Sequence, residues 1–162
     1  MKAGQALWLK INYADGGVAN YKRPFLIIDI NESQIKVLNT SSLKGKVHKS
    51  LFNEVIIINR YKPPFREKSF LKIDALYILP NLPDLAKCLL DNGNSIDKKE
   101  LDYIIQYFYD YSKNNNILTK EISAEELAIL NSSEIILEYE EEIVITDDIR
   151  IKENMRINEP VK

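Results

Sequence analysis

The sequence predicts an α+β fold: a small SH3-like β-barrel, helices after it, and an appended acidic, β-rich tail. Three observations lead to this prediction. Short apolar runs separated by turn residues fill the first half of the chain, helical patterns follow residue 80, and acidic residues concentrate after residue 116. Several short strands followed by helices are typical of α+β proteins, and a small barrel is the closed form expected of so few strands.

The expected strands are apolar runs bounded by turn residues. Between Phe25 and Leu38, two such runs are separated by Asn31, Glu32 and Ser33, which is the pattern of a β-hairpin. Pro80 ends a later run that begins at Ser69. We expect strands at residues 4–13, 25–30, 35–38, 52–59 and 69–79.

The expected helices carry their own start and stop signals. A short helix over residues 85–90 follows Pro83 and ends at Asp91-Asn92-Gly93. Asp97 and Glu100 have the spacing of a capping box, and the apolar residues behind them recur at the spacing of one helical face. A further helix runs from Ser123 to Leu130. Strand-like runs follow at residues 134–139, 143–146 and 149–151.

Composition indicates a folded protein with one main domain. The chain has 162 residues, of which 45% are apolar and 28% charged. We expect a body over residues 1–112 and an acidic extension over residues 117–162. Cys88 is the only cysteine, which permits no intrachain disulfide and predicts a reducing cytoplasm. One His and one Cys exclude a zinc site built from thiolates and imidazoles, and no apolar run has membrane-spanning length.

The charge is distributed unevenly. Residues 1–116 hold 17 Lys or Arg against 12 Asp or Glu, whereas residues 117–162 hold 5 against 12. A mildly basic body suits a polyanionic partner, although ordinary solubilising charge explains it equally well. The acidic run at residues 134–148 would either cover a basic surface or form a hairpin with a solvated acidic face.

The hairpin brings one guanidinium and several hydroxyls to the same end of the sheet. Arg23 enters its first strand and Thr40 leaves the second, so antiparallel pairing places them together. Ser41 and Ser42 follow Thr40. A guanidinium is always charged and clamps phosphate oxygens, so we expect a phosphate site here.

The same residues carry a family resemblance. The matching positions are Gly4 and Trp8 in the first strand, the Arg23-Pro24 pair, Thr40, and the stretch SFLKIDALYI at residues 69–78. Over residues 1–112 this pattern resembles the MazF/PemK family of toxin endoribonucleases.

The resemblance implies a metal-independent endoribonuclease without cofactors. It would cleave single-stranded RNA to a 2′,3′-cyclic phosphate, act as a cytoplasmic homodimer, and be neutralised by an acidic antitoxin protein. The residues that match or adjoin the family's catalytic positions are Arg23, Thr40 and Ser41. Two basic loops flank them, one of which interleaves cations with Tyr61 and Phe65. We expect RNA contacts by Lys22, which precedes Arg23, and by five residues of the two loops: Lys44, Lys46, His48, Arg60 and Lys62.

Other interpretations remain open. Val18 stands where many members carry an acidic loop residue, and Ala75 and Tyr77 stand where the family has Gln and Arg. These departures favour a catalytically inactive barrel that binds protein or nucleic acid. The loop over residues 59–68 would then be a proline-stiffened segment whose aromatic rings pack onto the barrel, and His48 an ordinary exposed histidine.

Overall fold

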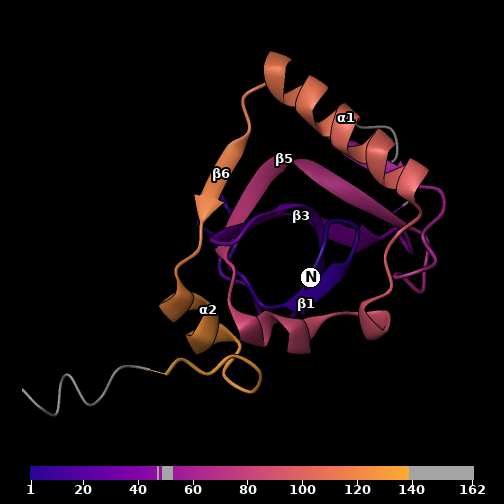
Figure 1. Cartoon of the computed structure of the whole chain (residues 1–162). Coiled ribbons are helices and arrows are strands. Elements are labelled where there is room, and N and C mark those ends of the chain that lie inside the picture. Colours follow the sequence, from indigo (N-terminus) through magenta and orange to yellow (C-terminus); the bar gives the residue numbers. More distant parts are fainter. Residues whose placement is uncertain (47, 49–52, 139–162) are drawn as a thin grey trace, which may run out of the picture.

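The structure is a computed structural model that describes residues 1–46, 48 and 53–138. It confirms an α+β architecture: a curved, mostly antiparallel six-stranded sheet with few helices (Figure 1). Within the described residues, no helix is both long and apolar enough to cross a bilayer.

Five strands form a continuous antiparallel path. They are, in spatial order, β1 (Ala6–Leu9), β2 (Arg23–Ile30), β3 (Gln34–Ser42), β5 (Ser69–Pro80) and β4 (Val55–Ile58). All were predicted, but β4 is shorter than expected, and so is β1, although the neighbouring Gly4 and Gln5 still exchange backbone hydrogen bonds with Ile27 of β2. At the start of β1, Gly4 has a positive φ of 99° and lies against Leu101, and a Cβ there would come within 3.3 Å of that side chain.

A sixth strand, β6 (Leu118–Glu121), was not predicted. It pairs in parallel with β5, in the register Ala75 with Leu118. Its sequence, LTKE, has no apolar alternation, and most of the strand is exposed. The first part of the acidic extension therefore belongs to the same sheet as the body.

Both faces of the sheet are buried, and alternate residues of β2 show this. Phe25 and Ile27 point into one apolar cluster, whereas Leu26 and Ile28 point into another. Helix α2 (Ala124–Leu130) inserts Leu127 into the first cluster. Helix α1 (Lys98–Asn114) covers the second with two buried side chains, Ile104 and Phe108. Two-sided burial explains why the strands read as continuous apolar runs.

Helix α1 begins where the capping pattern predicts, but only Asp97 caps it, and Glu100 binds another segment. The Asp97 carboxylate accepts hydrogen bonds from the backbone N–H groups of Lys99 and Glu100. The Glu100 carboxylate turns outward and accepts the N–H groups of Asn59 and Arg60 at 3.0 and 3.3 Å. The helix start thereby holds the segment that follows β4.

Two expected elements differ in the structure. The helix predicted over residues 85–90 is a 3₁₀ helix, η2 (Pro83–Cys88), and a second 3₁₀ turn, η3 (Asp91–Gly93), follows it. Residues 134–138 form no strand, because Asn131 starts a turn that directs the backbone towards η2, where the Ile136 N–H donates to Asp84. The strands expected at residues 143–146 and 149–151 lie outside the described residues.

Cys88 is expected to react slowly with thiol reagents in the folded protein. Its side chain is buried, and burial raises the pKa of the thiol to about 11. At pH 8 about one thiol in a thousand would be ionised, and the thiolate is the reactive species. Labelling with a chromogenic disulfide should be fast in 6 M urea and slow without it. Fast labelling of the native protein would contradict the burial.

Candidate functional site

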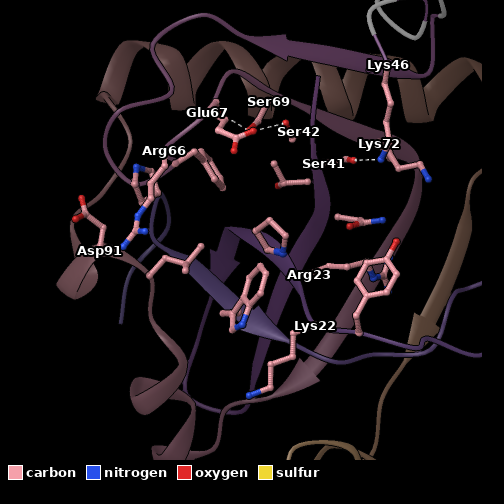
Figure 2. A pocket seen from close by; sticks show the side chains of 18 of the residues that line it. Lys22, Arg23, Ser41, Ser42, Lys46, Arg66, Glu67, Ser69, Lys72 and Asp91 are labelled. Atoms are coloured by element: carbon pink, nitrogen blue, oxygen red, sulfur yellow. Dashed lines mark hydrogen bonds between the residues drawn. The ribbon is translucent and has the colours of Figure 1, made fainter. Parts of the chain in front are cut away.

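A pocket of about 640 Å³ opens where β2 begins and β3 ends (Figure 2). Its walls come from segments far apart in the chain. Tyr13 and Lys22 belong to the β1–β2 connection, and Arg66 and Glu67 to the connection before β5. Lys72 comes from β5 itself. The antiparallel strands thus bring residues from the first and middle parts of the chain to one hollow.

Arg23 is held firmly at this pocket. Its side chain is 6% exposed, and Nη2 donates a hydrogen bond of 2.6 Å to the Ile11 carbonyl. The guanidinium carbon lies 4.0 Å from the ring centroid of Tyr13 and 5.0 Å from that of Phe25. Nε and Nη1 are buried and have no hydrogen-bond partner among the described residues. Buried donors without partners are rare and costly, so these two are well placed to bind an anion.

Thr40 and Asn39 line the same pocket as Arg23. Phe25 and Asn39 form the last pair of the β2–β3 ladder, so Thr40 lies just beyond it. Thr40 is 1% exposed and Asn39 is 5% exposed. Thr40 Oγ1 and Asn39 Oδ1 also have no hydrogen-bond partner within the described chain. Arg23 and Thr40 therefore face one hollow, as the antiparallel arrangement predicts.

The pocket is lined by more positive than negative charge. Its five cations are Lys22, Arg23, Lys46, Arg66 and Lys72, and its two carboxylates are Glu67 and Asp91. Lys46 Nζ donates to Ser41 Oγ at 3.0 Å, and Ser42 Oγ donates to Glu67 at 2.8 Å (Figure 2). Among the ion pairs of the described residues, none involves Arg66 or Lys72.

Tyr13 does not neutralise the guanidinium that it covers. Burial raises the pKa of its phenol, and the nearby charge of Arg23 only partly opposes this effect. The phenol is therefore a neutral hydroxyl at physiological pH. Arg23 keeps its full positive charge for an anionic ligand.

Comparison with known proteins gives no family for this chain. No family model matches it, and no curated protein matches it significantly. The site must be judged from its geometry. Within the part of the chain that the structure describes, no group of three or more His, Cys, Asp or Glu side chains is placed to hold a metal ion.

The predicted RNA contacts divide into two groups. Lys22 and Lys46 line the pocket with the predicted catalytic residues Arg23, Thr40 and Ser41. The remaining four, Lys44, His48, Arg60 and Lys62, do not line it.

Two of these four side chains, Arg60 and Lys62, have local contacts of their own. Arg60 forms an ion pair with Asp97 at 3.5 Å, and Lys62 Nζ lies 5.9 Å from the ring centroid of Tyr61. Lys44 donates its backbone N–H to Ser42, and His48 is exposed. Phe65 is buried in the core, so the aromatic rings of this loop pack onto the sheet, as the alternative interpretation predicts.

Sequence reasoning missed much of the pocket lining, including Tyr13, Asn39, Arg66, Glu67, Lys72 and Asp91. Arg66 lies in the basic loop, but composition does not say which of its cations turn inward. Lys72 pairs with Asn39 across the sheet, and this register depends on an irregularity in β5 that no local pattern signals. The only signal for Asn39 was its place before Thr40.

The acidic extension reaches the rim of the pocket. Lys22 Nζ lies 3.0 Å from the Glu134 carboxylate, which belongs to the turn after α2. One cation of the rim is thus already paired within the chain. The rest of the acidic run, residues 139–148, lies outside the described residues.

Proposed function

We propose that this chain is a MazF/PemK-like endoribonuclease that cleaves single-stranded RNA without a metal ion. The observation that carries the proposal is the pocket in which Arg23 and Thr40 hold buried, unpartnered polar atoms. Its excess of positive charge suits a phosphodiester backbone. The curved six-stranded sheet followed by helices is compatible with an SH3-like barrel, on which this family's site would be built.

The chemistry needs few groups, because RNA supplies the nucleophile. The 2′-hydroxyl loses its proton and its oxygen bonds to phosphorus, the bond from phosphorus to the 5′-oxygen breaks, and the 5′-oxygen takes up a proton as it leaves. A 2′,3′-cyclic phosphate and a 5′-hydroxyl remain. Nε and Nη1 of Arg23 donate to the phosphoryl oxygens as negative charge builds up on them. Thr40 Oγ1 donates a further hydrogen bond, and Lys46 keeps Ser41 at the entrance. Glu67 and Asp91, the two carboxylates of the pocket, are the candidates to accept the 2′-proton.

The resemblance also implies two binding partners, a second copy of the chain and an antitoxin. A homodimer would place two such pockets beside a shared groove, and an acidic antitoxin would compete with RNA for the same cations. The proposed location of the homodimer and its antitoxin is the cytoplasm. The positive lining of the pocket supports an acidic partner of this kind.

Removal of the Thr40 hydroxyl is expected to slow cleavage. Thr40→Val keeps the shape of the side chain but loses one hydrogen bond to the phosphate, which should lower the rate about tenfold. Thr40→Ser keeps the hydroxyl and should retain most of the rate. Both are compared on end-labelled RNA in EDTA. Equal rates for wild type and Thr40→Val would remove Thr40 from the site.

The decisive experiment uses the wild-type protein and a pool of RNA sequences in EDTA. We expect cleavage with 2′,3′-cyclic phosphate ends. If a folded wild-type protein binds the pool but cleaves no sequence in it, the inactive binding module is the better description. The departures at Val18, Ala75 and Tyr77 would then explain the loss of catalysis.

A further inference from the structure

A second, smaller cavity of about 80 Å³ adjoins the main pocket. Tyr13, Asn39 and Lys72 line both hollows, so these residues mark the border between them. A strand whose phosphate sits on Arg23 would pass Lys72, labelled in Figure 2, and bring a neighbouring base to the smaller cavity. At about one eighth of the volume of the main pocket, it offers room for the edge of a base.

An irregularity in β5 forms one wall of this cavity. The pairing of β3 with β5 shifts between Val37 and Asn39: Val37 lies opposite Tyr77, but Asn39 lies opposite Lys72. At this point β5 also changes its other neighbour, from β4 to β6. Bulges of this kind re-aim side chains beside functional sites. Here the exposed residue at the irregularity is Asp74, which lines the cavity.

Two acceptors without partners line the cavity, beside the ammonium group of Lys72. No ion pair or hydrogen bond among the described residues holds the Asp74 carboxylate. Asn39 Oδ1 is a second acceptor. The residue is only 5% exposed, and this oxygen has no hydrogen-bond partner in the described chain. Asp15, the other carboxylate there, already accepts the Gly17 N–H at 2.9 Å. The two free acceptors, the Asp74 carboxylate and Asn39 Oδ1, therefore match a ligand edge that carries adjacent N–H donors.

Among the four RNA bases, guanine carries that edge. Its N1–H and N2–H₂ groups lie side by side and match the two oxygens of a carboxylate. Adenine and cytosine place an acceptor nitrogen beside their amino group, and uracil flanks its N–H with two carbonyls. These acceptors would face the carboxylate and be repelled.

We propose that the smaller cavity reads a base next to the bound phosphate and selects guanine through Asp74. Asn39 accepts a further N–H at the border, and Lys72 binds the connecting phosphate. This inference rests on the proposed function, since it takes single-stranded RNA as the ligand of the main pocket. A good two-bond contact to a base discriminates by about tenfold or more.

The test measures binding, so that it does not depend on catalysis. Fluorescent 2′-O-methyl oligonucleotides carry no free 2′-hydroxyl and cannot be cleaved by this route. Four are compared: one of uridine alone, and three with a central guanosine, inosine or adenosine. Inosine lacks the N2 amino group and isolates its contribution. We expect the guanosine oligonucleotide to bind about tenfold tighter than the other three.

Asp74→Asn should reduce this preference to less than about twofold. The loss of one negative charge would strengthen the binding of every oligonucleotide, so the ratio of affinities is the readout. Asp29→Asn is the matched control, since Asp29 is an exposed strand residue that lines neither hollow. It changes the net charge equally and should leave the guanosine preference intact.

The outcomes separate this inference from the proposed function. Equal affinity for all four oligonucleotides, or a guanosine preference that survives Asp74→Asn, would overturn the reading of guanine. RNA cleavage that depends on Arg23 would still support the nuclease in that case. If the wild type neither binds these oligonucleotides nor cleaves RNA, both proposals are wrong.

Discussion

Replacing Arg23 by alanine is expected to lower the rate of RNA cleavage by about 10²- to 10³-fold. This is the usual effect of removing one donor that stabilises a developing negative charge in a closed site. Arg23 offers two such donors, Nε and Nη1, and its position is fixed by Ile11 and Tyr13. The rate is measured on end-labelled RNA in EDTA, under single-turnover conditions.

Two further variants make this result specific. Arg23→Met fills the buried space without a charge and should be as slow as the alanine variant. Arg60→Ala is the matched control, because Arg60 is exposed, pairs with Asp97 and does not line the pocket. It should stay within about twofold of the wild type. Wild-type cleavage by a folded Arg23→Met protein would rule the pocket out as the catalytic centre.

Replacing Asn131 by alanine is expected to lower the free energy of unfolding by about 2 to 4 kcal/mol. This amide is 2% exposed and ties the end of α2 to the strand region after β1. Its Oδ1 accepts the Lys10 N–H at 2.8 Å, and its Nδ2 donates to the carbonyls of Lys10 and Leu127, both at 3.0 Å. The variant would leave the N–H and carbonyl of Lys10 without these partners, whereas the Leu127 carbonyl would still accept the backbone N–H of residue 131. Urea unfolding followed by circular dichroism measures the change.

The chain offers a matched asparagine for comparison. Asn115 is exposed and donates one hydrogen bond to the Tyr111 carbonyl at 3.0 Å. Asn115→Ala should change the unfolding free energy by no more than about 0.5 kcal/mol. If Asn131→Ala were equally mild, the attachment of the extension would rest on its other contacts, such as the apolar packing of Leu127 and Ile135 and the ion pair of Glu134 with Lys22.

Local signals predicted the elements whose cause is local. The cap at Asp97, the hairpin around Asn31 and the stop at Pro80 each follow from the chemistry of neighbouring residues. Antiparallel pairing was then enough to bring Arg23 and Thr40 to one hollow. This part of the site needed only the order of the strands.

The remainder depended on contacts between distant segments. β6 forms because β5 offers it an edge, and nothing in the sequence LTKE announces a strand. The charges of Arg60 and Lys62 are visible in the sequence, but their direction is set by Asp97 and by the packing of the loop. Lys72 enters the pocket through the shifted register of β5. Position in space, more than residue type, decided which cations reached the site.

The attachment of Lys10 to Asn131 spans 121 positions of the chain. During translation, the chain must therefore emerge at least as far as Asn131 before the strand region near the N-terminus is secured. Contacts of such long range form late, because the closure of a long loop precedes them. A nascent chain that has emerged only to α1 lacks both β6 and this attachment. The newly made protein would thus gain this attachment only after α2 has emerged.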